Sequence, residues 1–253
     1  MYLVFDIETV PDVAALGRWL RLPAEADADT VMAAFSEARP DAVMPKPLFH
    51  QIVAIAGAVI GDDGRLQTLR AMGDPDDSEA ALIERFFAYL ERAHPRLVGW
   101  NSSGFDLPCL QYRALRHRLA IGAFYRQRGY RYRYNEEFHW DLMDLLSAYG
   151  ASTRVALDEM AALCGIPGKL EVDGRDVWPL YRAGQLDRIR RYCETDVLST
   201  SIIFVRYALL RGLFDTGRAA AFDDSVTTLL RETEEEHLKA YREAWSALDE
   251  GPS

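Results

Sequence analysis

The apolar positions in the first part of the chain predict strands. Residues 2–6 form a short apolar run, and residues 51–60 are nearly all apolar, as expected of a strand buried on both faces. Gly61-Asp-Asp-Gly64 follows as a hairpin turn and leads to a third strand over 65–72. Further short apolar runs predict two more strands, at 96–99 and 139–142.

Helical spacing dominates the remaining chain. Leu82, Ile83, Phe86 and Leu90 recur on one helix face behind a helix start at Asp76-x-x-Glu79. Residues 120–137 show no helical period. Three strands joined by a hairpin, then alternating helix and strand, then helices, predict an α/β fold with a mixed sheet. The other predicted helices cover 13–22, 26–38, 107–119, 142–149, 155–164, 184–212 and 222–247.

Length and composition limit the class of protein. The chain has 253 residues, 49% of them hydrophobic, which suits one large domain or one domain with an elaboration. We expect this domain over 1–253, with an inserted helical and Pro-rich segment at 11–47 and a helical extension at 215–253. No apolar run approaches the ~20 residues of a membrane span, no secretory signal follows Met1, and the three cysteines form no CxxC pair. These features predict a cytoplasmic protein with no membrane partner.

The charge is unevenly distributed. The net charge of −10 argues on average against a polyanion as partner. Leu107–Asn135, however, contains seven Arg and no Asp or Glu. This basic window, residues 107–135, gives the acidic chain a local surface on which nucleic acid can bind.

Two carboxylates end the first predicted strand. Asp6 and Glu8 stand two positions apart, so their side chains point to the same face. Adjacent carboxylates repel each other unless a cation lies between them, and oxygen ligands suit Mg²⁺ or Mn²⁺. Asp-x-Glu alone is equally compatible with two solvated acids, since Asp77-Ser-Glu79 repeats it in a predicted helix start.

Two later segments add further candidates. Asp106 follows Gly99-Trp-Asn-Ser-Ser-Gly-Phe and precedes Pro108, which predicts a helix N-cap that also fixes a carboxylate at the mouth of the sheet. Tyr192 and Asp196 share one face of a predicted helix at a spacing of four residues. Each segment alone fits an ordinary structural role.

Together and in this order, the three segments resemble the motifs of the DEDD superfamily of 3′–5′ exonucleases. Tyr192, four positions before Asp196, matches the tyrosine branch, and position 191 is Arg where the histidine branch has His. The surrounding residues resemble stand-alone exonucleases related to the proofreading domain of family-B DNA polymerases. The resemblance covers residues 2 to about 214 and implies a ribonuclease H-like fold with a five-stranded sheet.

The resemblance also implies a mechanism. Asp6, Glu8, Asp106 and Asp196 would hold two divalent cations, Mg²⁺ or Mn²⁺, and Tyr192 would orient the attacking water. An unperturbed tyrosine pKa of ~10 favours this positioning role over proton abstraction. The expected reaction releases nucleoside 5′-monophosphates from the 3′ end of single-stranded nucleic acid, with DNA favoured over RNA.

Candidate substrate-binding residues lie mostly in the basic window. Arginines there can bind phosphates and tyrosines can stack on unpaired bases, although a solvated loop with packed tyrosines would have the same composition. Lys169 follows a predicted helix, where a phosphate contact and a plain loop are both open. His139 is expected to be structural. The full candidate set is Asn101, Phe105, Arg128, Arg131, Arg133, Tyr130, Tyr132 and Lys169.

Other functions fit the same fold. A catalytically silent module could bind single strands in a repair or replication complex, but such a protein should have lost part of the acidic set. An endonuclease or strand-transfer enzyme would lack a tyrosine four residues before the last Asp. A separate polymerase or repair protein is a candidate partner, and the sequence leaves the oligomeric state open.

Overall fold

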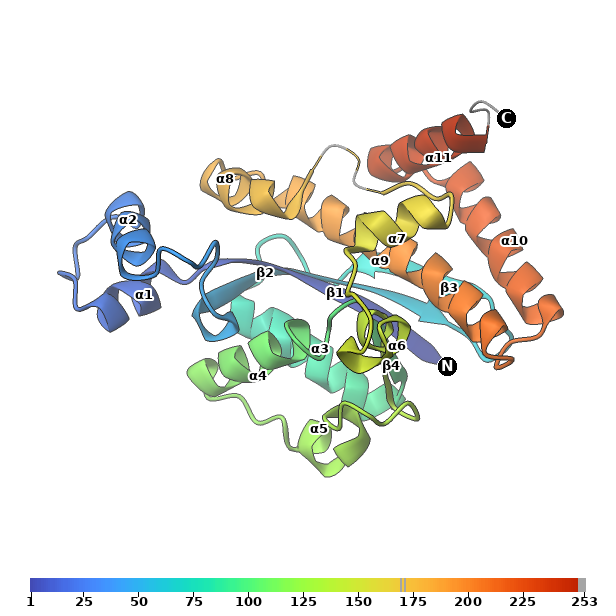
Figure 1. Ribbon diagram of the computed structural model, residues 1–253, viewed down its shortest axis with the longest axis horizontal. Helices are drawn as coiled ribbons and strands as arrows, with labels where there is room; N and C mark the ends of the chain where they lie inside the picture. Colours follow the sequence, from blue (N-terminus) through green and yellow to red (C-terminus); the bar gives the residue numbers. More distant parts are fainter. Residues whose placement is uncertain (169, 171, 250–253) are drawn as a thin grey trace.

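The protein is built around a five-stranded mixed sheet with strand order β3-β2-β1-β4-β5 (Figure 1). The computed structural model describes residues 1–168, 170 and 172–249. β2 pairs antiparallel with β1 and β3, whereas β4 pairs parallel with β1 and β5, so the predicted mixed sheet is confirmed. The strands are β1 (Tyr2–Pro11), β2 (His50–Ile60), β3 (Leu66–Ala71), β4 (Arg96–Gly99) and β5 (His139–Asp141).

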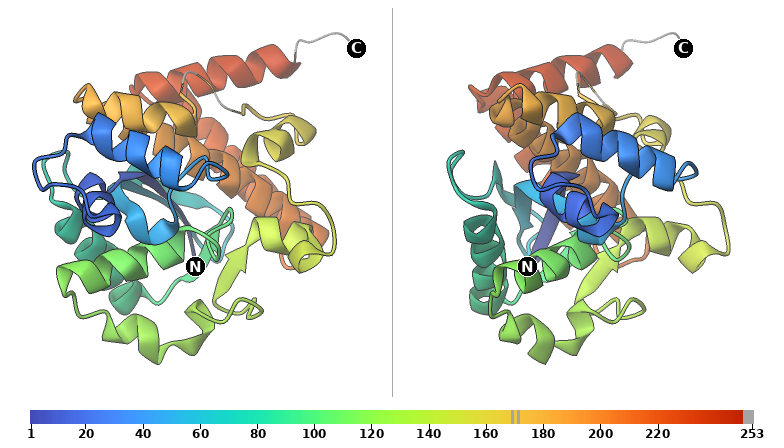
Figure 2. Two further views of the ribbon diagram at one scale, coloured as in Figure 1. Left: turned by 60° about the vertical axis from the view of Figure 1, so that its left-hand side comes forward. Right: turned by 90° about the vertical axis from the view of Figure 1, so that its left-hand side faces the viewer.

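Helices cover both faces of this sheet (Figures 1 and 2). The long helix α9 (Leu186–Leu210) packs across β1, β2 and β3 on one face. On the same face lie α7 (Leu157–Leu163), α8 (Val177–Arg182), α10 (Thr216–Glu232) and α11 (Glu236–Asp249). On the opposite face lie α3 (Glu79–Ala93), α4 (Asp106–His117) and α5 (Gly122–Arg126). This arrangement is the ribonuclease H-like fold that the sequence predicts.

The alternation along β1 decides which face carries the acidic residues. Leu3, Phe5 and Ile7 belong to the core under α3 and α4, whereas Tyr2 and Val4 belong to the core under α9. Because successive side chains point to opposite faces, the even positions beyond Val4 also lie on the α9 side. The two carboxylates predicted to act together therefore face the helix that carries Tyr192.

A small helical unit projects from one end of the sheet (Figures 1 and 2). Its helices α1 (Val13–Leu20) and α2 (Ala28–Ala38) enclose a separate core. Asp12 and Asp27 cap these helices by accepting from Ala15 N and Thr30 N. The unit corresponds to the helical part of the segment predicted at 11–47. Its buried residues are Leu16, Val31 and Phe35.

Several predicted boundaries are wrong. The helix expected over 222–247 is two helices, because Thr233 leaves the helical conformation (ψ 142°) and lets Leu238 and Tyr241 of α11 turn back onto the core of α9. Ser78, not Asp76, caps α3. Part of 120–137 is helical, as α5 and a 3₁₀ turn at Arg128–Tyr130. No helix among the described residues has an apolar stretch long enough to span a bilayer.

Candidate active site

Asp6 and Glu8 lie in the middle of β1, not at its end as the sequence suggests. β2 pairs with β1 all the way to Pro11, with a bulge between Glu8 and Thr9, and this pairing extends the strand beyond its apolar run. On the other side, β4 pairs with β1 only up to Val4. Beyond Val4, β1 no longer pairs with β4, and the loop that follows β4 leads to Asp106.

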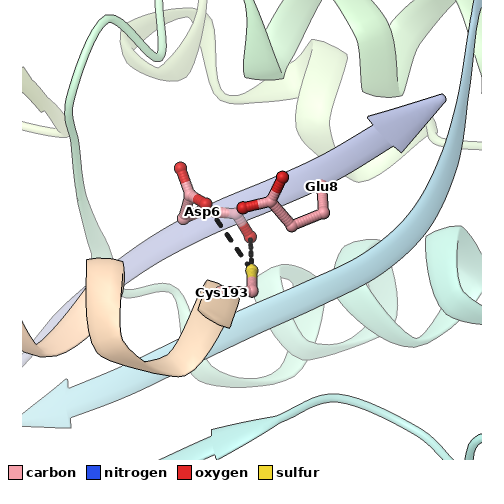
Figure 3. Close-up of side chains that lie close together, drawn as sticks. All are labelled: Asp6, Glu8 and Cys193. Atoms are coloured by element: carbon pink, nitrogen blue, oxygen red, sulfur yellow. Dashed lines mark hydrogen bonds between the residues drawn. The ribbon is translucent and has the colours of Figure 1, made fainter. Parts of the chain in front are cut away.

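Cys193 of α9, the helix that packs over β1, points toward Asp6 (Figure 3). Its thiol lies 3.4 Å from the backbone oxygen of Asp6 and 3.5 Å from Asp6 Oδ2. Ligand atoms of Asp6, Glu8 and Cys193 all lie within 4.8 Å of one another. The sequence analysis missed Cys193, although it stands three residues before Asp196 and so on the same helix face.

Asp106 enters the site from the first turn of α4. The sequence predicts it as the N-cap, but Phe105 takes that position and Asp106 is the first helical residue. It is 3% exposed, and the backbone of Ile7 is among the groups that act on the pKa of its carboxyl. The start of α4 therefore lies near β1, where Ile7 stands between Asp6 and Glu8.

The acidic groups perturb one another strongly. Burial, and then the charges of Asp106 and Asp196, raise the pKa of Asp6 well above its usual range. Burial raises the pKa of Glu8 in the same way, followed by the charges of Asp6, Asp196 and Asp106. Burial also raises the pKa of Asp106 to about 7, with a further contribution from Asp141. The carboxylates from three elements therefore share one electrostatic field.

Tyr192 and Asp196 complete this group from α9. The two residues stand four positions apart on this helix, and the Asp196 carboxylate acts on the Tyr192 hydroxyl. Burial raises the pKa of Tyr192, and the charges of Asp196 and Glu8 add to the rise. Tyr192, Asp196 and Asn101 line one cavity of about 340 Å³ between the loop after β4, α7 and α9. The structure thus brings together residues from the second and third predicted segments.

The loop that carries Asn101 is fixed by Asp141. The carboxylate of Asp141 accepts from Asn101 N at 3.0 Å and from Ser103 N at 2.8 Å. It also accepts from Asp144 N and so caps α6 (Leu142–Leu146). Asn101 is in the left-handed region (φ 58°), which Asn tolerates better than most residues. Asp141 therefore shapes the site through the backbone.

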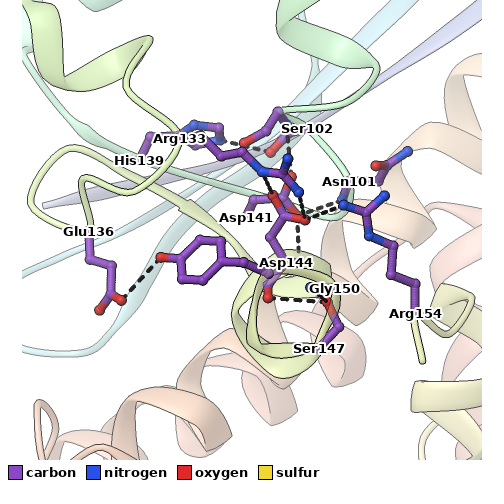
Figure 4. Close-up of polar contacts among 12 residues, drawn as sticks. Asn101, Ser102, Arg133, Glu136, His139, Asp141, Asp144, Ser147, Gly150 and Arg154 are labelled. Carbon is purple, nitrogen blue, oxygen red and sulfur yellow. Dashed lines mark hydrogen bonds and ion pairs between the residues drawn. The ribbon is translucent and has the colours of Figure 1, made fainter. Parts of the chain in front are cut away.

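Further polar contacts lie around this loop and Asp141 (Figure 4). Ser102 Oγ lies 2.8 Å from His139 Nε2, and burial lowers the pKa of His139 to about 4, so its ring is neutral and structural as expected. Asp144 is paired with Arg133 at 2.5 Å and with Arg154 at 2.9 Å. Although burial opposes it, these pairs hold the pKa of Asp144 below its usual range.

Comparisons with known proteins show the family and the fold of the chain. A family model described as a predicted 3′–5′ exonuclease related to the exonuclease domain of PolB matches residues 43–245. The chain belongs to this family. The match includes the segments of Asp106 and of Tyr192 and Asp196. It does not include Asp6 and Glu8, which precede residue 43.

Two DNA polymerases are similar to this PolB-exonuclease-related chain. A DNA polymerase of Archaeoglobus fulgidus is 24% identical over 167 residues, which are 63% of this chain and 20% of the polymerase. The structure of the family B DNA polymerase from Pyrobaculum calidifontis aligns with a TM-score of 0.52 and 18% identity, over 95% of this chain and 29% of that chain. This likeness shows the fold, and the chain spans less than a third of either relative.

The remaining substrate-binding candidates have mixed outcomes. The ring of Tyr130 is 2% exposed, stacks on Phe124 and donates its hydroxyl to the Pro95 carbonyl, so the prediction that it offers a face to a base is wrong. Arg133 is already engaged by Asp144. Phe105 is half-buried with its ring edge-on to His50.

Part of the basic window stays accessible. Arg128, Arg131, Tyr132 and Asn135 line a cavity of about 410 Å³. The Tyr132 side chain is 61% exposed, while the Arg131 guanidinium lies 4.6 Å from the centroid of the Tyr125 ring. Lys169 lies outside the described residues.

Proposed function

We propose that the protein is a metal-dependent 3′–5′ exonuclease that releases nucleoside 5′-monophosphates from single-stranded nucleic acid, with DNA favoured. The observation that carries this proposal is the convergence of Asp6, Glu8 and Asp106 without a counter-charge. No Lys, Arg or His among the described residues forms an ion pair with any of the three. Family membership supplies the class of reaction.

The donor set fits two divalent cations. Clustered carboxylate oxygens are the ligands that Mg²⁺ and Mn²⁺ prefer, and their mutual repulsion is relieved when cations bind between them. Asp6, Glu8 and Asp196 would hold one ion, and Asp6 with Asp106 the other. When bound, the ions supply activation of water and charge compensation for the leaving 3′ oxygen.

Tyr192 is suited to positioning rather than to proton abstraction. Its raised pKa keeps the hydroxyl protonated at neutral pH, so the group can donate a hydrogen bond but is a poor base. The hydroxyl lies beside Asp196 at the wall of the cavity that Asn101 also lines. A water held there would be oriented by Tyr192.

The substrate strand is proposed to enter through the cavity lined by Asn101. Arg128 and Arg131 offer guanidinium groups to phosphates further along the strand, and the exposed ring of Tyr132 offers a stacking face. A separate polymerase is the proposed partner class, because both similar proteins are polymerases.

Digestion of 5′-labelled oligonucleotides tests the proposal. Single-stranded DNA and RNA are incubated with Mg²⁺, Mn²⁺ or EDTA, and each substrate is also supplied with a blocked 3′ end. We expect stepwise shortening from the 3′ end that requires the metal and stalls at the block. Cleavage that ignores the block would indicate an endonuclease, and binding without cleavage would indicate a silent module.

A further inference from the structure

A second cavity lies behind Tyr192. It has a volume of about 330 Å³, within the range of small-ligand sites, and forms between α9, residues 170 and 172, and the start of α11. Leu170, Val172 and Ala240 give it apolar walls. Tyr192 lines both this cavity and the one that contains Asp196, so the two cavities share this residue.

Two arginines of α9 line this second cavity. Arg188 and Arg191 are three positions apart and so share a helix face. Both side chains are exposed. Arg191 and Tyr192 both line this cavity, and Tyr192 also lines the cavity that contains Asp196.

Neighbouring arginines on α9 have different surroundings. Arg190 donates to the backbone oxygens of Met72 and Gly73, at 3.2 and 2.7 Å, and so fixes α9 to the end of β3. Arg191 forms no hydrogen bond or ion pair with any residue that the structure describes. Packing therefore accounts for Arg190 but not for Arg191.

The acids near the cavity have other partners. Glu236, which lines the cavity, pairs with Lys239 at 3.1 Å. Glu194 lies 2.7 Å from His237 Nε2 and also accepts from Ala71 N. Neither acid is paired with Arg191. A guanidinium group that has no carboxylate partner among the described residues, and that lines a cavity with apolar walls, is suited to a phosphate.

We propose that this cavity binds the phosphodiester next to the one being cleaved, with Arg191 as the phosphate contact and Arg188 one turn away. The inference rests on the proposed exonuclease function, because Tyr192 connects the cavity to the cleavage site. Arg191 would then be a cationic contact to the substrate on α9, separate from the basic window at residues 107–135.

Arg191→Gln tests this assignment, with Arg65→Gln as the matched control. Arg65 is an exposed arginine in the β2–β3 hairpin, beyond the end of β2 that pairs with Tyr2. We expect Arg191→Gln to weaken binding of a fluorescent single-stranded oligonucleotide in EDTA by about 10-fold, as for one charged hydrogen bond. The log–log salt slope should fall by about 0.7, since one phosphate contact is lost.

Kinetics separate this role from a role in the chemistry. With an oligonucleotide, KM should rise while kcat stays unchanged. With the p-nitrophenyl ester of thymidine 5′-monophosphate, whose only phosphate is the one cleaved, Arg191→Gln should match the wild type. An equal loss on both substrates would overturn the proposal, as would equal weakening of a free nucleoside 5′-monophosphate, which would make the cavity a product site.

The two proposals fail in different ways. If the wild type cleaves and Arg191→Gln binds with unchanged affinity and salt slope, the cavity assignment is overturned and the exonuclease function stands. If the wild type binds but never cleaves, and Arg191→Gln binds more weakly, the exonuclease function is overturned and the phosphate contact stands. Equal thermal unfolding of the two variants confirms that folding is intact.

Discussion

Two groups of buried acids in this protein have opposite electrostatics. Asp12 and Glu79 surround Arg113, which is 2% exposed and lies 2.6 Å from each carboxylate. Burial opposes ionisation of Asp12, but the hydrogen bonds from Arg113 and Ala15 outweigh it, and the pKa of Asp12 falls below its usual value. The acids around Asp6 are buried in the same fold, yet their pKa values are raised.

The difference shows what each group requires. Three buried carboxylates that join elements of the fold, Asp12, Glu79 and Asp144, each have an arginine partner. Asp141, which has no such partner, is instead held by the backbone N–H groups of Asn101, Ser103 and Asp144. At Asp6, Glu8 and Asp106 the described residues supply no arginine partner. Such an arrangement is costly unless a cation from solution compensates it. This contrast is the main support for the proposed metal site.

Asp6→Asn should give the largest effect on activity. If Asp6 is shared by both proposed cations, kcat should fall by several orders of magnitude. Stability without metal should stay equal or rise, because one repelling charge is removed. Asp224→Asn, an exposed acid on α10, is the control and should change neither. Near-wild-type activity of Asp6→Asn would refute the shared role.

Arg113→Met should mainly lower stability, whereas Asp6→Asn should mainly lower activity. It leaves Asp12 and Glu79 buried without their partner, so unfolding free energy should fall by ~3–5 kcal/mol in a urea titration. Arg65→Met, at an exposed site, should remain within about 0.5 kcal/mol of the wild type. A loss below ~1 kcal/mol for Arg113→Met would mean that the two acid groups do not differ as described.

Tyr192→Phe should reduce kcat by ~10²-fold, less than Asp6→Asn. The substitution keeps the ring, which belongs to a residue that lines both cavities, and deletes only the hydroxyl on which Asp196 acts. KM should change little. Unchanged kcat would leave Tyr192 with a packing role alone.

The pH dependence of stability should also separate the two groups. Because the pKa of Asp106 is raised from 3.8 to about 7, folded protein holds its proton more tightly than unfolded protein. Stability in EDTA should therefore fall as pH rises from about 4 to 7, by up to ~1.4 kcal/mol per unit for this group. The lowered pKa of Asp12 adds no change in this window. Asp106→Asn should flatten the decline, and a rise of stability with pH would contradict it.

The sequence predicts the five strands, the hairpin and the three acidic segments because these depend on local patterns. It cannot show that β1 continues to Pro11, since the polar residues after Asp6 end the apolar run and only pairing with β2 extends the strand. It cannot separate Tyr130 from Tyr132, which have similar neighbours but differ in burial once the chain folds against Phe124. The pairing of Arg133 with Asp144 likewise depends on tertiary structure.

Calorimetric titration of Mn²⁺ into the wild type and Asp6→Asn tests the central claim most directly. If the uncompensated acids form the metal site, the wild type should bind two ions per chain, and Asp6→Asn should lose both, because each proposed ion uses that carboxylate. Asp224→Asn should bind like the wild type. No binding by the wild type, or equal binding by Asp6→Asn, would contradict the account.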